Sequence, residues 1–292
     1  MIMRTKLMKT FPKRIAAAGL IAGAVLAAGA LSQPAMASTG GVSTPHMQKW
    51  SFGGVFGRFD RAQLKRGLQV YREVCSACHG LKRVAFRTLS QPGGPELSED
   101  VVKELAAEYE IKDGPDDEGE MYDRPGTLKD YFPSTYPNDK AARAANNGAL
   151  PPDLSIITKA RGYHRGFPGW FLDLFTGYQE AGADYVHALL TGYEEEPPEG
   201  FHLVDGMSYN HYFGGNQIGM PPPLSDELVE YEDGTKATVD QMAKDVTAFL
   251  MWTAEPTLEQ RKRLGFQVFL FVLLLSGMLY FTTKRLWHGV KH

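Results

Sequence analysis

Apolar residues recur with the spacing of an α-helix in several parts of the chain. Between residues 59 and 75 they follow one helical face, and Asp60 is placed to cap the start. The residues on that face are Leu64, Leu68, Tyr71 and Cys75. Similar patterns predict helices over 98–110, 141–147 and 183–191, and a fifth helix that begins at a capping box, 238–241, and ends before Pro256.

Two long stretches lack any usable period. Residues 113–137 contain the run DGPDDEGE, and residues 194–236 contain five prolines. Glycine, proline and acidic residues favour loops, and the prolines of ALPPDLS forbid a helix there. No strand and no internal repeat is convincing. We therefore expect an all-α domain with long loop insertions.

The chain opens with the pattern of a secretory signal. Basic residues from Arg4 to Arg14 precede an apolar stretch, 15–31, and the small-residue sequence Ala35-Met36-Ala37 follows. A retained N-terminal membrane helix is the alternative, but the stretch is short and weakly apolar for that role. We expect a cleaved signal peptide over 1–37, which would place the mature chain outside the cytoplasm.

A second apolar stretch lies near the other end. Residues 264–283 carry no charge, and at about 1.5 Å per residue they can cross the roughly 30 Å hydrocarbon core of a bilayer. Basic residues flank both ends, which suits lipid headgroups better than a protein core. The sequence therefore predicts an exported domain, 38–260, one C-terminal transmembrane anchor, 261–285, and a cytoplasmic tail, 286–292.

Charge is distributed unevenly between these regions. The formal net charge is -3, but residues 38–260 hold all 34 acidic residues and only 20 of the 31 basic ones. An acidic exported domain argues against nucleic acid as a partner and favours a basic protein partner drawn in by charge. The alternative is that the acidic residues only keep the domain soluble.

Both cysteines of the chain lie in one motif, Cys75-Ser-Ala-Cys78-His79. Two thiols at this spacing can add to the two vinyl groups of one haem, and the adjacent histidine is then placed to bind the iron. A zinc site would need a second ligand pair, a dithiol redox site usually follows a strand, and a Cys75–Cys78 disulfide would constrain almost nothing. The motif thus predicts one covalent haem c with His79 as a metal ligand.

The second axial ligand decides the function. A methionine sulfur would fill the coordination sphere and favour electron transfer, whereas an open position would favour gas or peroxide chemistry. Met220, in NQIGMPPPL, is our candidate because Gly219 permits a close approach and the following prolines stiffen the loop. Met207 and Met121 are the substitutes, and ordinary packing is the alternative role of Met220.

Several segments together resemble the cytochrome c1 family, the haem subunits of ubiquinol-cytochrome c reductase (cytochrome bc1) complexes. They cover most of residues 59–285 in order. The segments are RGLQVYREVCSACHGL, DGPDDEGEMYDRPGTLKDYFP, AARAANNGALPPDLS, DYVHALLTGY, GMPPPL, YEDGTKATVDQMAKDVTAFLMWTAEP and RKRLG. The resemblance implies a cytochrome c-type haem domain of the bacterial kind.

The resemblance also implies roles for individual residues. It assigns His79 and Met220 as axial ligands, and Asn146 and Pro152 to the lining of the haem pocket. It further places Tyr71, Arg161 and Tyr185 near the haem propionates, although helix packing and a surface charge would also explain these three. Residues 162–183 look longer than in the compact mitochondrial form, which leaves the path from Arg161 to Tyr185 open.

The resemblance implies an electron carrier without substrate chemistry of its own. Electrons would pass from the Rieske iron-sulfur protein, through the haem, to a soluble or membrane-tethered cytochrome c, beside cytochrome b in the lipid. The complex would be dimeric, would lie in a bacterial inner membrane with the haem domain in the periplasm, and would couple quinol oxidation to a proton gradient. Two alternatives stay open: a tethered subunit of a terminal oxidase or nitric oxide reductase, and a haem sensor with an open sixth site.

Overall fold

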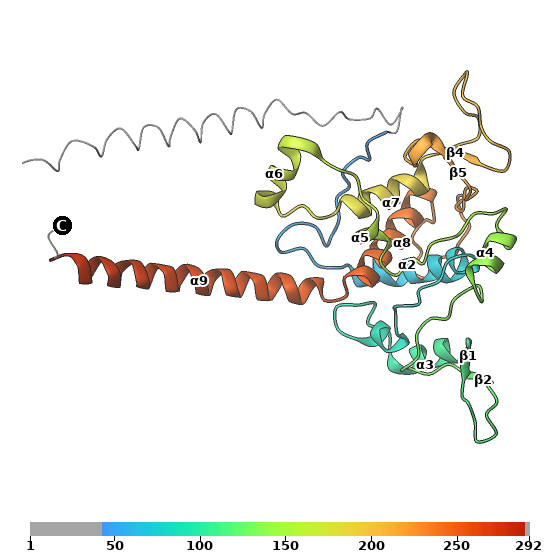
Figure 1. Ribbon diagram of the computed structural model, residues 1–292, viewed down its shortest axis with the longest axis horizontal. Coiled ribbons are helices and arrows are strands. Elements are labelled where there is room, and N and C mark those ends of the chain that lie inside the picture. Colours follow the sequence, from blue (N-terminus) through green and yellow to red (C-terminus); the bar gives the residue numbers. More distant parts are fainter. Residues whose placement is uncertain (1–42, 290–292) are drawn as a thin grey trace, which may run out of the picture. The chain divides into compact units, whose positions relative to one another are not determined.

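The computed structural model describes residues 43–289, so the predicted signal peptide and the last residues of the predicted tail lie outside the described residues. Helices dominate, joined by long loops (Figure 1). The α-helices are α2 (Arg61–Glu73), α3 (Glu99–Ala107), α4 (Asp139–Ala145), α5 (Ile157–Ala160), α6 (Gly166–Thr176), α7 (Ala181–Thr191), α8 (Val239–Ala254) and α9 (Leu258–Trp287). Three short 3₁₀ turns are Cys75–Ala77, Phe86–Ser90 and Gly214–Asn216.

The predicted first helix is α2, and its predicted cap is correct. Asp60 is extended, and its side chain accepts hydrogen bonds from the backbone N–H groups of Ala62 and Gln63. The apolar face is buried, whereas the rest of the helix carries polar and charged residues. The helix ends just before Cys75, so its C-terminal end delivers the cysteine motif.

Helix α8 is the main packing partner of α2. Thr238 caps its first turn by accepting from the N–H of Gln241, and the helix stops at Ala254, before Pro256, as the sequence predicts. The two helices approach closely at Gly67, where a Cβ would lie 2.1 Å from the backbone oxygen of Asp245. Only a residue without a side chain fits at this crossing.

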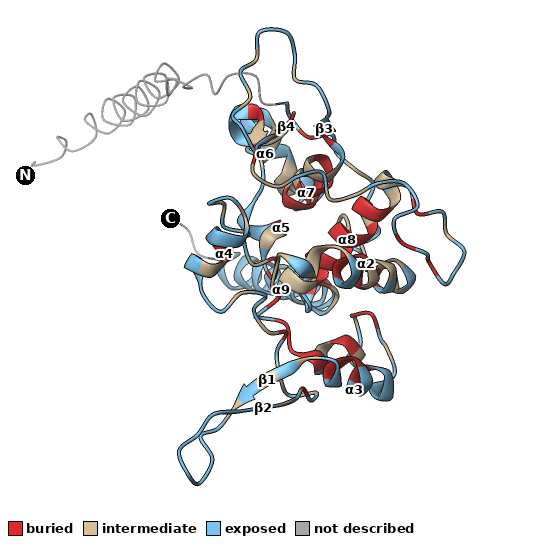
Figure 2. Cartoon of the chain, turned by 90° about the vertical axis from the view of Figure 1, so that its right-hand side faces the viewer, coloured by how far each residue is buried: buried red, intermediate tan, exposed pale blue. Residues whose placement is uncertain are grey.

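A single apolar core joins these two helices to α7, to α5 and to the turns near residues 81–89. In Figure 2 buried residues lie on α7, α8 and α3. The largest fully buried side chains of this core include Trp252, Phe249, Phe86 and Phe132. The start of the cysteine motif packs against this core.

The expectation of no strands was wrong, although every strand is short. Strands β1 (Glu110–Asp113) and β2 (Tyr122–Pro125) form an antiparallel hairpin, with Glu110 opposite Pro125 and Asp113 opposite Tyr122. Strands β3 (Tyr193–Glu194), β4 (Ser208–Asn210) and β5 (Gln217–Ile218) form a second antiparallel sheet in the order β3-β4-β5. Segments of two to four residues are too short for an alternating pattern to show. The fold remains mostly helical.

Helix α9 contains the predicted anchor and extends beyond it. Its 30 residues span about 45 Å at about 1.5 Å per residue, and it is apolar enough to cross a membrane. Its first turn is bound to the domain: Glu259 accepts from Arg61 at 2.7 Å and from the backbone N–H of Phe59 at 2.9 Å. Lys262 donates to two backbone carbonyls, those of Phe52 and Gly54.

Candidate functional site

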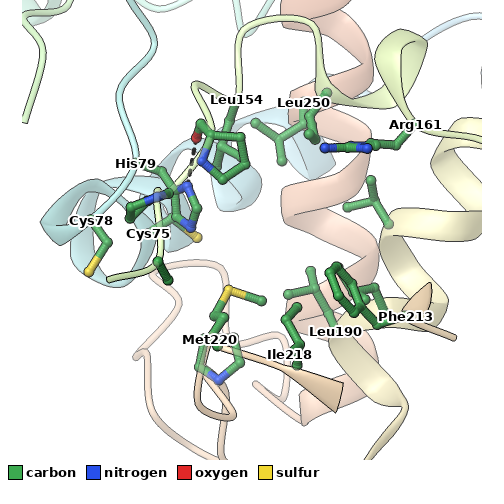
Figure 3. Close-up of a pocket in the computed structure, with 18 of the residues that line it drawn as sticks. Cys75, Cys78, His79, Leu154, Arg161, Leu190, Phe213, Ile218, Met220 and Leu250 are labelled. Carbon is green, nitrogen blue, oxygen red and sulfur yellow. Dashed lines mark hydrogen bonds between the residues drawn. The ribbon is translucent and has the colours of Figure 1, made fainter. Parts of the chain in front are cut away.

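A cavity of about 400 Å³ opens between the cysteine motif and α8. Its walls come from the end of α2, the segment 146–161, α7, the loop after β5, and α8 (Figure 3). Most lining side chains are apolar, and among them are Val74, Leu154, Val186, Leu190, Phe213, Ile218, Val246 and Leu250. The titratable residues of the lining are Cys75, Cys78, His79, Arg161 and Tyr185.

One tight turn brings the cysteine motif to a single wall. After α2 ends, the N–H groups of Cys78 and His79 both donate to the carbonyl of Cys75, at 3.2 and 2.9 Å. Both cysteines and the histidine therefore line the cavity. Burial, aided by the neighbouring Cys78, raises the pKa of the Cys75 thiol to about 12. The thiol is thus protonated at neutral pH.

The imidazole of His79 is held in one tautomer. Its Nδ1 lies 2.7 Å from the carbonyl oxygen of Pro152, drawn as a dashed line in Figure 3. Because a carbonyl only accepts, Nδ1 carries the proton and Nε2 keeps a free lone pair. Burial lowers the pKa of His79 below its ordinary value of 6.5, which favours the neutral ring. The Nε2 atom is therefore able to bind a metal ion.

Met220 faces the same cavity from the loop after β5. Its backbone carbonyl accepts a hydrogen bond from Tyr193 at 3.2 Å, and Pro221 and Pro223 also line the cavity. The two substitutes lie elsewhere: Met207 is 38% exposed and Met121 is 55% exposed, and neither is part of the lining. Of the three methionines weighed as a ligand, the structure brings only Met220 to the cavity of His79.

Asn146 and Pro152 also line the cavity. Asn146 follows the last turn of α4, where its side-chain amide donates to Tyr136 at 3.0 Å and to the carbonyl of Ala142 at 2.7 Å. Pro152 cannot donate, but its carbonyl fixes the ring of His79. The pair therefore shapes the wall beside the histidine.

Arg161 and Tyr185 also reach the cavity, although residues 162–184 separate them in sequence. Helix α7 packs on α5 so tightly that a Cβ at Gly182 would lie 1.7 Å from the carbonyl oxygen of Thr158. The chain therefore returns, at Gly182, to the helix α5 from which the segment 162–183 departs. Burial raises the pKa of Tyr185, while the charge of Arg161 opposes that rise. The Arg161 guanidinium itself makes no hydrogen bond or ion pair within residues 43–289.

Tyr71 is placed differently from the other predicted site residues. It is not part of the cavity lining but lies beneath it, 2% exposed, with its ring against Phe132 and Phe249. Its hydroxyl donates to the backbone carbonyl of His79 at 2.9 Å. Burial raises its pKa well above the ordinary value, so the hydroxyl stays protonated and able to donate. Tyr71 therefore holds the backbone of His79 from the core side of the cavity.

Sequence reasoning did not identify most of the apolar lining. A signal was present for Val246 and Leu250, which are four residues apart on the inner face of the predicted fifth helix. No such signal was present for Phe213 and Ile218, because they lie in a stretch without hydrophobic periodicity. The cavity as a whole is apolar, with the His79 ring, the Met220 sulfur and two thiols in its wall.

Comparison with known proteins gives one family. Residues 50–290 match the Cytochrome C1 family. The chain is 51% identical to cytochrome c1 of Blastochloris viridis over 90% of the chain and 92% of that protein. It is 48% identical to cytochrome c1 of Rhodospirillum rubrum over 98% of the chain and all of that protein. It is 57% identical, over 91% of the chain, to cytochrome b/c1 of Bradyrhizobium diazoefficiens, but spans only 39% of that longer protein.

Proposed function

The chain belongs to the cytochrome c1 family, and from this premise we propose that it is the haem-bearing electron-transfer subunit of a cytochrome bc1 complex. The observation that carries the proposal is the cavity shared by His79 and Met220, with Cys75 and Cys78 in its wall. The chain's task is to hold one redox group and fix its surroundings.

The residues of the cavity fit a covalent haem c. Cys75 and Cys78 would form the two thioether bonds, and His79 Nε2 and the Met220 sulfur would be the axial ligands. A haem iron with these two ligands exchanges single electrons at a raised reduction potential and leaves no open position. The apolar lining would keep water away from a bound haem, which also favours a raised potential.

Three further residues position these ligands. The Pro152 carbonyl fixes the tautomer of His79, and Tyr71 holds the histidine backbone. Tyr193 holds the backbone of Met220. Arg161, with no other partner for its charge among the described residues, would compensate a haem propionate together with Tyr185.

We place the subunit in a bacterial inner membrane, with the haem domain in the periplasm and α9 beside cytochrome b. Electrons would come from the Rieske iron-sulfur protein and go to a soluble or tethered cytochrome c. Quinol oxidation and proton release belong to the whole dimeric complex. The exposed acidic residues of the β1–β2 loop, 116–120, support docking of a basic acceptor.

The ligand assignment is tested with Met220→Leu in the intact complex. Removal of the sulfur should lower the midpoint potential and allow the reduced protein to bind CO, because the sixth position is then open. Met207→Leu is the matched control and should change neither property. An unchanged midpoint potential in Met220→Leu would show that another residue is the sixth ligand. Rapid CO binding by the native protein would favour a haem sensor with an open sixth site.

The assignment to a complex needs a separate experiment. Purification of the chain from membranes in mild detergent, followed by identification of its partners, should yield cytochrome b and a Rieske protein. Copper or high-spin haem subunits in their place would instead indicate a terminal oxidase or nitric oxide reductase.

A further inference from the structure

We propose that α6, together with the loop 52–57, forms a second membrane contact of this chain, which lies in the lipid headgroup region beside α9. The inference rests on α9 crossing the membrane, as in the proposed function. It concerns the segment between Arg161 and Tyr185, which none of the roles above uses.

Helix α6 exposes large apolar side chains that nothing in the described chain covers. Five of them form what we call the α6 patch: Phe167 (80% exposed), Trp170 (53%), Phe171 (44%), Leu172 (51%) and Phe175 (73%). Three of the aromatic rings contact each other in series, with centroids 6.0 Å apart for Trp170–Phe171 and 5.3 Å for Phe171–Phe175. Such a cluster of exposed aromatic residues marks an interaction surface.

The polar groups of this region are used to hold α6 on the domain. Asp173, the only charged residue of the helix, is paired with Arg165, whose guanidinium lies 4.6 Å from the ring of Tyr178. Tyr178 in turn donates to Asp184, a fully buried residue of α7. The helix is therefore fixed to the core through its charged residue, and the α6 patch is left without any charge.

The α6 patch continues toward α9 through the loop 52–57. A Cβ at Gly177, just after α6, would lie 3.3 Å from Val55, and the ring of Phe56 packs 5.3 Å from that of Phe266 in α9. Val55 and Phe56 are themselves 49% and 73% exposed. Figure 1 shows α6 and this loop on the side of the domain toward which α9 runs. Apolar residues of the loop 52–57 thus lie between the end of α6 and the start of α9.

The chemistry of this surface fits lipid. Tryptophan and phenylalanine are favoured at the boundary between headgroups and acyl chains. Arg263, an exposed residue near the start of α9, supplies a positive charge that favours anionic headgroups beside the loop 52–57. The loop 52–57 is tied to the start of α9 by the hydrogen bonds from Lys262 to Phe52 and Gly54.

The proposal can be tested by spin labelling of the haem-loaded chain in its complex, reconstituted into liposomes. Single cysteines are introduced by Phe171→Cys and, as a second site in the patch, Phe175→Cys. Val101→Cys, at a residue of α3 that is 48% exposed, is the matched control on the domain surface, and Val272→Cys reports on α9. Each nitroxide is then exposed to oxygen, which concentrates in lipid, and to a water-soluble nickel chelate.

The labels at 171 and 175 should be severalfold more accessible to oxygen than to the chelate, as at 272, and the label at 101 should show the reverse. A label at 171 as accessible to the chelate as that at 101 would overturn the proposal. Protection from both reagents would also overturn it, because it would show that another protein covers the patch. A label at 272 without lipid exposure would instead contradict the membrane span, and labelling of the unsubstituted chain would contradict thioether bonding of Cys75 and Cys78.

Discussion

The crossing of α2 and α8 at Gly67 gives a prediction with a defined size. In Gly67→Ala the new methyl group would lie 2.1 Å from the Asp245 carbonyl oxygen and 2.6 Å from the Cβ of Phe249, so the helices must separate. Overpacking at a site with rigid neighbours costs up to about 3 kcal/mol, and the better helix propensity of alanine returns about 1 kcal/mol. The net loss is about 2 kcal/mol of unfolding free energy, which lowers the apparent Tm by about 4–8 °C.

The assay is thermal loss of the low-spin haem absorption in the purified complex, at one heating rate for every variant. Because α8 supplies Val246 and Leu250 to the cavity, separation of the helices should also speed CO binding to the reduced protein. Gly265→Ala, in the interior of α9 with nothing near the new methyl, is the matched control and should not lower the midpoint. Equal midpoints for both variants and the native protein would refute the steric argument.

Three further predictions concern charge. Arg66→Ala leaves the fully buried Asp245 without its cation and should lower the free energy of unfolding by about 3–5 kcal/mol, measured by chemical denaturation. Lys244→Ala breaks an exposed ion pair and should lower it by less than about 1 kcal/mol. Equal losses for the two variants would contradict this prediction. Burial lowers the pKa of His187 below 6.5, so the unfolded chain binds that proton more readily, and the apparent Tm should fall as the pH drops from about 6.5 through the folded-state value. His187→Gln should flatten this decline; an unchanged slope would exclude His187 as its source. Replacement of the acidic side chains at 116–120 by their amides should raise KM for a basic cytochrome c at low salt and have little effect at high salt, while a loss independent of salt would argue against docking there.

Local signals in the sequence were enough to place the elements that carry the candidate ligands. Asp60 and Thr238 cap their helices as predicted, because a side-chain oxygen at the first unpaired N–H groups acts over a few residues only. The cysteine motif and Met220 were found from residue type and spacing, and the structure brings them to one cavity. What these groups bind stays a prediction.

Longer-range features were beyond such reasoning. The place of Tyr71 beneath the cavity depends on packing between α2, Phe132 and α8, which no local pattern along the chain predicts. The meeting of Arg161 with Tyr185 depends on the contact of Gly182 with α5. Helix α6 was missed because its residues are apolar on nearly every side, which gives no amphipathic period.

The attachment of α9 leaves little freedom between the domain and its anchor. Only three residues separate α8 from α9, and Glu259 and Lys262 bind the first turn of α9 to Arg61 and to the loop 52–57. A membrane helix adjusts its tilt to the thickness of the bilayer, and here there is no flexible linker to absorb that tilt. We therefore expect the domain to lean with its helix. The distance that an electron must travel to a docked partner would then depend on the thickness of the lipid in which the chain is anchored.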